Sequence, residues 1–532
     1  MSERPRQTNS KWVPSLGEII FAAVLAWLFL GGTGAVALLG DGDTGWHIRT
    51  GEYILANKTF PKQDLFSFSR AGQPWFAWEW LSDVALAVVH AKAGLPGVVL
   101  LAGILIAATS ALLFRYMIWQ GSNLLVAVGA MLMASSASTI HWLARPHLIS
   151  YLFLAVSMWA LEADRRRPSP RIYALVALAA LWTNLHGGFG ALVATVGLYL
   201  AGSVAQTFWS PRRSWDWTAA KRYGLLLAGV AGATLVNPYT YQLHGHIWQY
   251  LRSDFILSHV QEFQSPSFRG EGMRHFELLL FAGLAAAPAL LRRREVIPAL
   301  LIVFWAHQAL TSARHVLLYV VVAAPIVAHE TTLLLDRAAE AGIGWVRTIR
   351  EIAQDYGAGV YGSGRGPAWA WLAPLSVVAV GAVLLGAPRS ERLRAEFSRL
   401  KFPVEACAFA GPDLLGKRIF TSDQWGDYLI YRYYPRLKVF IDGRSDFYGP
   451  ELGRDYLRAM NAHHQWEQIF DRHGFEVALL PAEWPLSTTI KRHPGWRLKY
   501  DDGRALLLER VRPASAADRT AGDAATSRRG QG

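Results

Sequence analysis

The residues with the clearest chemical potential lie directly after an apolar segment near the start of the chain. Asp41 and Asp43 are separated by a single glycine there and follow the apolar residues 19–39. Two ionised carboxylates this close raise each other's proton affinity unless a cation lies between them. Asp43 and Asp41 can therefore hold a divalent metal such as Mg²⁺ or Mn²⁺, or Asp43 can take a proton from an acceptor hydroxyl as a general base. The alternative is that Asp43 or Thr44 only caps a solvated amphipathic helix.

A short helix is expected directly after the two aspartates. Trp46, Arg49 and Tyr53 recur there at helical spacing. A guanidinium forms paired hydrogen bonds with phosphate oxygens. Arg49 is therefore a candidate ligand for the phosphate of a donor substrate.

Further candidate phosphate ligands lie at the ends of other apolar segments. They are Arg145, His147, His186, Arg314 and His315. Ionisable residues at membrane depth are costly and often functional, but each can instead anchor a helix at the level of the lipid headgroups. The histidines form no metal-binding pattern, so a histidine metal site is not favoured.

The composition indicates a membrane protein. Of 532 residues, 52% are apolar and only 17% are charged, whereas soluble domains average about 25% charged residues. The 22 tryptophans fit side chains that prefer the membrane–water interface. The only cysteine, Cys407, excludes an intrachain disulfide and a cysteine zinc site. The net charge of +13 is explained by the Lys and Arg residues that cytoplasmic loops of membrane proteins carry. No nucleic-acid partner is therefore predicted.

Eleven segments have the length and hydropathy of membrane-spanning helices. They are 19–39, 97–118, 123–142, 148–163, 171–189, 190–208, 223–237, 276–291, 296–312, 315–335 and 369–387. Residues 80–94 are apolar but short and carry charges, so they form either an interfacial helix or another short span. The predicted fold is an α-helical polytopic membrane protein of about 11–13 spans with a C-terminal soluble α/β domain.

The basic clusters give the orientation, because loops rich in Lys and Arg stay in the cytoplasm. Residues 1–18 are then cytoplasmic, and 19–387 form a transmembrane domain with outer loops at 40–78 and 238–275. The α/β domain, 388–511, lies outside the cell membrane (the inner membrane where there are two), and 512–532 form a disordered tail. This topology puts the candidate phosphate ligands on the same face as Asp43.

The C-terminal domain alternates short β-like runs with helical stretches. The runs are 418–421, 438–441, 477–481, 496–500 and 505–509, and the helical stretches include 451–460 and 466–473. Dinucleotide and P-loop patterns are missing from the sequence. Asp442 and Arg444 follow one β-like run, where ligands often bind, and are candidate acceptor-binding residues. The alternative is an Asp–Gly turn stapled by the arginine. Trp484 and Trp496 either stack on sugars or, as we favour, pack in the core.

The first-loop spacing resembles the GT-C superfamily of multi-span glycosyltransferases, which use lipid-linked phosphosugars. Asp43, Arg49, Glu52 and Tyr53 repeat a spacing similar to that of the oligosaccharyltransferase catalytic subunit. Two further stretches resemble that family: Val260-Gln261-Glu262 is similar to its short acidic acceptor motif, and 422–428 to its WWDYG signature in another order. The rest of the first loop, 60–80, resembles uncharacterised bacterial membrane proteins grouped with these enzymes.

One part of the sequence departs from the family. Where the second outer loop of oligosaccharyltransferases has an acidic pair, residues 140–147 of this chain include Arg145 and His147 but no acidic residue. Transfer of an oligosaccharide to asparagine is therefore not the expected reaction. Glu79 and Glu262 are candidate acceptor-binding residues, although Glu79 can instead cap a helix.

The resemblance implies an inverting glycosyltransferase. It would move a sugar or glycan from a polyprenyl-phosphate-type donor to a glycan, lipid or protein acceptor outside the membrane, in cell-envelope glycan or glycoprotein synthesis. Two alternatives stay open: a protein similar to O-antigen polymerases or ligases, and a non-catalytic membrane scaffold.

Overall fold

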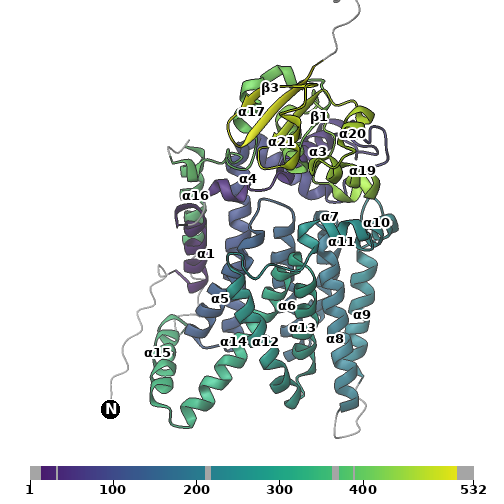
Figure 1. The fold of residues 1–532 in the computed structure, drawn as a ribbon. Helices are drawn as coiled ribbons and strands as arrows, with labels where there is room; N and C mark the ends of the chain where they lie inside the picture. Colours follow the sequence, from purple (N-terminus) through teal and green to yellow (C-terminus); the bar gives the residue numbers. More distant parts are fainter. Residues whose placement is uncertain (1–13, 32–33, 210–216, 362–370, 387–389, 512–532) are drawn as a thin grey trace, which may run out of the picture. The chain divides into compact units, whose positions relative to one another are not determined.

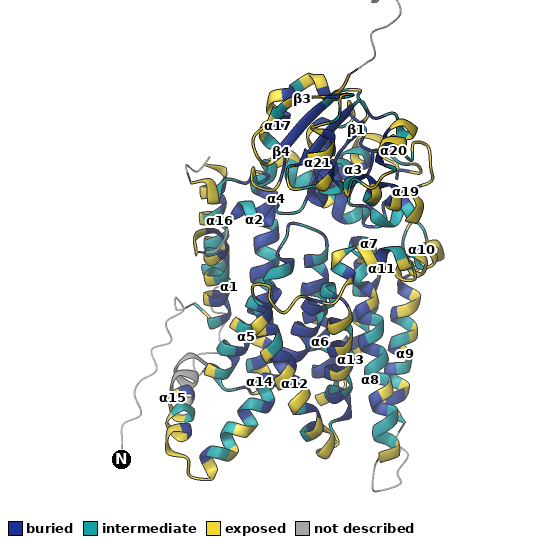
Figure 2. Cartoon of the chain, viewed as in Figure 1, coloured by how far each residue is buried: buried dark blue, intermediate teal, exposed yellow. Residues whose placement is uncertain are grey.

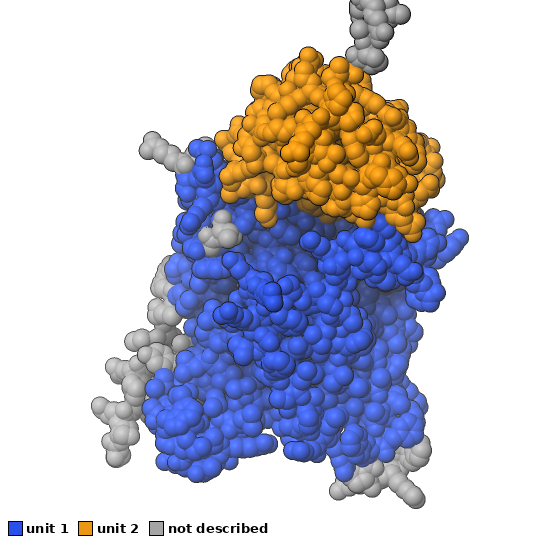
Figure 3. All heavy atoms as spheres, in the orientation of Figure 1, with its two compact units in different colours: residues 1–41, 50–60, 77–396 blue, residues 42–49, 61–76, 397–532 orange. Residues whose placement is uncertain are grey.

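The computed structural model describes residues 14–31, 34–209, 217–361, 371–386 and 390–511 (Figure 1). The chain divides into two compact units, coloured separately in Figure 3. Unit 1 contains residues 1–41, 50–60 and 77–396, and unit 2 contains residues 42–49, 61–76 and 397–532. The expected disordered tail, 512–532, lies outside the described residues.

Unit 1 is built from helices. They are α1 (Leu16–Ala26), α2 (Ala35–Leu38), α4 (Trp80–Gln120), α5 (Leu124–Ser138), α6 (His147–Arg166), α7 (Ala174–Leu185), α8 (Gly190–Trp209), α9 (Thr218–Ala233), α10 (Tyr241–Leu251), α11 (Asp254–His259), α12 (Met273–Arg292), α13 (Val296–Thr311), α14 (Val316–Glu340), α15 (Gly344–Tyr361) and α16 (Leu372–Leu385). Helix α3 (Asp43–Asn57) contributes its first residues to unit 2 and its remainder to unit 1. A helix lies in each of the eleven segments expected to span the membrane.

Five described helical segments are long and apolar enough to cross a membrane: Trp80–Gln120, Leu124–His141, Gly187–Trp209, Met273–Arg292 and Ala313–Glu340. Three shorter apolar helices accompany them: Leu16–Gly31, Val296–Thr311 and Leu372–Leu385. Many large apolar side chains on these helices are exposed. Figure 2 colours the exposed residues of the helices yellow. Such a surface suits a lipid solvent, so the chain is a polytopic helical membrane protein. The exact number of spans stays a prediction.

Local sequence explains where several helices begin and bend. Ser15 and Glu18 form a capping box at the start of α1, and the side chain of Asn123 accepts the backbone N–H groups of the first turn of α5. Gly94, which has a φ of 59°, and the nearby Pro96 interrupt α4. Residues 80–94 are therefore a separate helical section, consistent with an interfacial helix or a short span.

Unit 2 contains a four-stranded sheet in the order β1-β2-β4-β3. The strands are β1 (Ile419–Phe420), β2 (Val477–Pro481), β3 (Trp496–Asp501) and β4 (Ala505–Arg510), and the helices are α17 (Val404–Ala410), α18 (Asp423–Tyr433), α19 (Ser445–Met460), α20 (Trp466–His473) and α21 (Pro485–Ile490). Strands β1 and β2 are parallel, whereas β4 is antiparallel to both of its neighbours. The expected α/β domain is confirmed.

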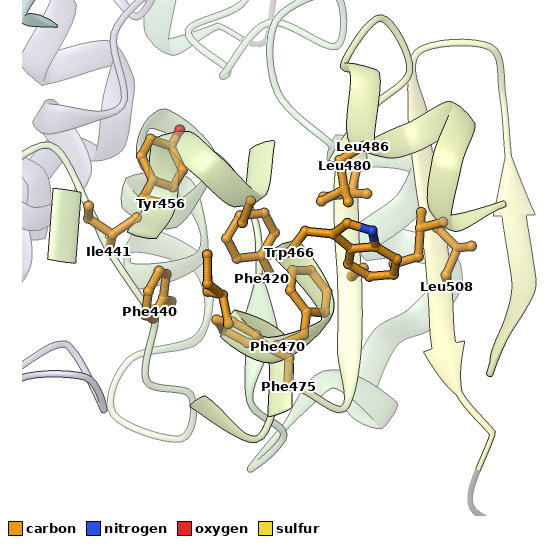
Figure 4. Packing of buried hydrophobic residues seen from close by; sticks show 14 of the residues in the cluster. Phe420, Phe440, Ile441, Tyr456, Trp466, Phe470, Phe475, Leu480, Leu486 and Leu508 are labelled. Atoms are coloured by element: carbon orange, nitrogen blue, oxygen red, sulfur yellow. The ribbon is translucent and has the colours of Figure 1, made fainter. Parts of the chain in front are cut away.

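The core of unit 2 is rich in aromatic side chains. Phe420, Phe440, Phe470 and Phe475 pack together between the sheet and the helices (Figure 4). Trp496 belongs to this core, as favoured from the sequence. The apolar cluster gives the small unit a substantial interior of its own.

The expected strand at 438–441 is not a strand of this sheet. Val439 instead forms an isolated parallel bridge with Ser67, which comes from the segment 40–78 after the first apolar helix. The backbone N–H of Phe68 donates to the oxygen of Val439, and the N–H of Val439 donates to the oxygen of Phe66, both at 2.9 Å. Part of the first loop is therefore built into unit 2, so the domain expected over 388–511 also contains residues from near the start of the chain.

Candidate functional site

Four charged side chains meet in unit 1. Arg145 Nη1 donates to Asp41 Oδ2 and to Glu262 Oε1, at 2.8 Å in each case. Arg314 Nη2 donates to the other oxygen of Glu262 at 3.0 Å, and its guanidinium lies 4.2 Å from the ring centroid of Phe263. We call Asp41, Arg145, Glu262 and Arg314 the charged cluster. It joins residues from four segments that the sequence analysis treated separately.

Backbone contacts hold these segments together. The N–H of Ala144 donates to the oxygen of Leu38 at 2.7 Å, which joins the segment of Arg145 to the one that leads to Asp41. The N–H of Ala313 donates to the oxygen of Gln264 at 2.9 Å, beside Arg314 and Glu262. The charged cluster thus rests on ordered backbone rather than on side-chain contacts alone.

Ser312 and His141 close the same region. Ser312 Oγ donates to the backbone oxygen of Glu262 at 2.9 Å. His141 Nε2 lies 3.0 Å from the backbone oxygen of Ala313. Because that oxygen can only accept, Nε2 carries the proton in this arrangement. His141, the start of α14 and the 262–264 segment are therefore tied together.

Two of the predicted histidines, His147 and His186, lie near each other. His147 Nε2 is 2.6 Å from the oxygen of His141, and the rings of His147 and His186 are 6.5 Å apart. The Nδ1 of His186 accepts from the N–H of Gly188 at 2.9 Å, which leaves the proton on Nε2. That nitrogen lies 3.6 Å from an oxygen of Glu79. Glu79 therefore lies beside His186 within unit 1.

Sequence reasoning missed the residues that support His186. Ser150 Oγ lies 2.7 Å from His186 Nδ1, and Trp182 Nε1 donates to Ser150 Oγ at 2.7 Å. At Gly188, a side chain would collide with Ser150 and His186, and at Gly187 it would collide with Trp78. The two glycines that follow the histidine were the available signal, because they allow close approach of neighbouring groups.

His315 follows Arg314 in the chain, but its ring contacts residues of a neighbouring helix. Its Nδ1 is 3.2 Å from the oxygen of Gln308, and its ring lies 6.4 Å from Trp305. Both contacts tie it to α13. A role in binding phosphate stays a prediction for this residue.

The electrostatics of the charged cluster favour ionised side chains. The Arg145 guanidinium, helped by Arg314, holds the pKa of Glu262 below its ordinary value, although burial acts in the opposite direction. Side-chain exposure is 13% for Asp41, 17% for Arg145 and 29% for Glu262, so solvent screens these charges only in part. The Glu262 carboxylate is therefore charged at neutral pH.

Asp43 belongs to unit 2. Its carboxylate is buried and packs against Gly443, where a Cβ would collide with it. The carboxylate of Asp427 accepts from the N–H of Gly443 at 3.0 and 3.2 Å and lies close to the same point. Asp43 is the first residue of α3. The structure thus assigns Asp41 and Asp43 to different units.

Arg49 also lies in unit 2. Its Nε donates to the oxygen of Tyr431 at 2.9 Å, and its guanidinium lies 5.3 Å from the centroid of the Tyr431 ring. Arg49 is thereby attached to α18. A contact of Arg49 with a donor phosphate stays a prediction.

Asp442 and Arg444 form a buried ion-pair network. Arg444 donates to Asp442 from Nε at 2.8 Å and from Nη2 at 2.6 Å, and to Asp64 at 2.8 Å. The side chains of all three residues are at most 2% exposed. The geometry favours the alternative in which the arginine staples the turn, because neither Asp442 nor Arg444 presents its charge to solvent.

The metal expectation has limited support from the side chains. Among the described residues, no group of three or more His, Cys, Asp or Glu side chains is arranged to hold a metal ion. The Asp41 carboxylate is engaged by Arg145, and both oxygens of Glu262 are engaged by arginines. The donor set around Asp41 therefore does not fit a divalent ion.

A comparison with solved structures bears on the fold. Neither a family model nor a curated protein sequence matches the chain. Among solved structures it is similar to the archaeal oligosaccharyltransferase AglB from Archaeoglobus fulgidus, in a complex with an inhibitory peptide and a dolichol-phosphate. The TM-score is 0.52 at 11% identity, over 94% of this chain and 74% of AglB. The chain therefore shares its fold with an oligosaccharyltransferase, the family that its first loop resembles.

Proposed function

We propose that this protein is a membrane glycosyltransferase that moves a sugar or glycan from a polyprenyl-phosphate-type donor to an acceptor outside the membrane. The observation that carries the proposal is the charged cluster, in which two arginines and two carboxylates meet in the helical unit. The fold shared with AglB supports the same class, and the AglB structure contains a dolichol-phosphate.

The arginines suit the leaving group of such a reaction. A guanidinium has five N–H donors, so it can bond a carboxylate and a phosphate together. In our proposal Arg145 and Arg314 bind the phosphate of the donor lipid. Their charge stabilises the negative charge that develops on that phosphate as its bond to the sugar breaks.

An acceptor hydroxyl attacks the anomeric carbon in this mechanism. The new bond forms on the face opposite the phosphate, so the configuration inverts, and the hydroxyl proton passes to a carboxylate. Asp43, the first residue of α3, remains our candidate base. His147, His186 and Glu79 line the same part of unit 1 and are proposed to orient the donor and the acceptor.

The test is a transfer assay in membranes that contain the full-length protein. Labelled sugars from a pooled set of polyprenyl-linked donors are followed into endogenous acceptors, for wild type, Arg145→Gln, Asp41→Ala and Asp43→Ala. Arg171→Gln is the matched control, because Arg171 is an exposed arginine of the same unit. We expect Arg145→Gln and Asp43→Ala to lose transfer while the control keeps it.

Each outcome separates the candidate functions. Transfer that persists after both aspartates are replaced would favour a protein similar to O-antigen polymerases or ligases. A wild type that binds polyprenyl phosphate without transferring sugar would favour the non-catalytic scaffold. Membrane insertion of every variant, measured by fractionation, shows that a loss reflects chemistry rather than folding.

A further inference from the structure

One nitrogen atom bridges two carboxylates in the charged cluster. Asp41 Oδ2 and Glu262 Oε1 both accept from Nη1 of Arg145 at 2.8 Å, the usual length of a charge-assisted hydrogen bond. The two carboxylates come from distant parts of the chain and are partly withdrawn from water. Two such charges require a counter-ion to share a site. Arg145 is that counter-ion.

A divalent metal would compete with Arg145 for the same oxygens. Mg²⁺ needs near-octahedral oxygen ligands at about 2.0–2.1 Å, but both of these oxygens point at a guanidinium, and the second oxygen of Glu262 accepts from Arg314. A metal here would add a third cation beside two arginines. The chemistry of the donor set thus disagrees with the metal expected from the two aspartates.

The position of Arg145 is fixed from both sides. Its neighbour Ala144 is bonded to Leu38, and the N–H of Leu148 donates to the oxygen of Arg145 at 3.3 Å, next to the first turn of α6. The side chain is 17% exposed and is fastened at its tip by the two carboxylates. A guanidinium held in this way loses little further freedom when it binds a ligand.

We propose that Arg145 is the resident cation of this site and binds a lipid-linked phosphate without a divalent metal. Asp41 and Glu262 are then positioning residues, which hold the guanidinium and do not coordinate a metal or bind an acceptor. The proposal rests on the proposed function for the identity of the ligand, a polyprenyl mono- or diphosphate. Its claim about the cation is independent of that identity.

The experiment uses the purified full-length protein in nanodiscs. Binding of a polyprenyl monophosphate is measured by native mass spectrometry or a fluorescent analogue, with EDTA and with added Mn²⁺. Binding of Mn²⁺ alone is measured by the loss of the signal of the free ion in electron paramagnetic resonance. The variants are Arg145→Lys, Arg145→Gln and Arg145→Asp, with Arg171→Gln as control.

We expect wild type to bind polyprenyl phosphate equally with EDTA or Mn²⁺ and to bind no Mn²⁺ at millimolar concentration. Arg145→Lys keeps the positive charge but loses the paired N–H donors of the guanidinium, so the affinity for polyprenyl phosphate should fall about tenfold. Arg145→Gln should lose about ten- to a hundredfold. Arg145→Asp, which places three carboxylates together, should gain Mn²⁺ binding.

Mn²⁺ binding by wild type, or ligand binding that EDTA abolishes and Mn²⁺ restores, would overturn the proposal. These two measurements use wild type alone, so they stand even where a variant fails to fold. If wild type binds neither ligand, the proposed function fails while the absence of a metal site is upheld. The two failures are therefore distinguishable.

Discussion

Replacement of Arg444 by methionine separates a structural role from an acceptor-binding one. The side chain is 2% exposed and neutralises Asp442 and Asp64, whose carboxylates are fully buried. Methionine keeps much of the volume but leaves two unpaired buried charges. Breaking a buried ion pair by removing one partner costs about 3–5 kcal/mol. At about 1.4 kcal/mol per factor of ten, the unfolded fraction of unit 2 should rise by about 10²- to 10⁴-fold.

Cys407 provides the assay for this change. It is the only cysteine of the chain, it belongs to unit 2, and it is 1% exposed. Burial raises the pKa of its thiol to about 12, so the folded state should react slowly with a maleimide. The labelling rate of full-length protein in mild urea therefore reports how often unit 2 opens.

The control is Lys491→Met. Lys491 pairs with Asp501 at 2.6 Å, but its side chain is 46% exposed, and surface pairs contribute at most about 1 kcal/mol. The labelling rate of Cys407 should change by about fivefold or less. A rate for Arg444→Met within the range of this control would refute the reasoning. Loss of transfer without faster labelling would instead support the acceptor-binding role.

Three further perturbations test the site. Gly443→Ala forces the carboxylate of Asp43 to move, and if Asp43 is the base, transfer should fall by about 10²-fold in an initial-rate assay. Ser150→Ala removes the hydroxyl beside His186 Nδ1, and the transfer rate should fall about five- to tenfold. Because the pKa of Glu262 lies below its unfolded value of about 4.3, its contribution to stability is complete above that pH and is lost as the pH falls through the folded pKa. The melting temperature in detergent should therefore be steady from pH 8 to about pH 5 and decrease below about pH 4, less steeply for Glu262→Gln.

Matched controls accompany these variants. Gly190 has open space around it, so Gly190→Ala should leave transfer unchanged. Ser157 lies in the same helix as Ser150, and its hydroxyl donates to the backbone oxygen of Phe153 in that helix, so Ser157→Ala should preserve the rate. If Gly443→Ala and Gly190→Ala transfer equally well, the position of Asp43 does not matter for chemistry. If the melting temperatures of wild type and Glu262→Gln change equally with pH, Glu262 does not contribute to the loss of stability in acid.

The helices were accessible from sequence because their signal is local. Hydropathy located every segment that the structure shows as a long apolar helix, and the spacing of Trp46, Arg49 and Tyr53 correctly indicated α3. The partners of Arg145 were not accessible, since Asp41 and Glu262 are 104 and 117 residues away. Such pairs depend on tertiary packing, which no periodicity records.

The strand expected at 438–441 was wrong for a related reason. Its apolar pattern describes burial, which the structure confirms for Val439 and Phe440. Burial arises there from a bridge to Ser67 and from the aromatic core, not from the four-stranded sheet. A short apolar run therefore predicts the interior position but not the hydrogen-bonding partner.

The participation of the first loop in unit 2 has a consequence for biogenesis. The N–H of Gly42 donates to the side chain of Gln424 at 2.8 Å, across 382 residues of chain. At about 5–20 residues per second, a ribosome needs about 20–80 s to synthesise that interval. The loop must therefore leave the ribosome and wait for its partner while the intervening helices insert. We expect a nascent chain arrested before residue 397 to expose this loop to protease, and the completed chain to protect it.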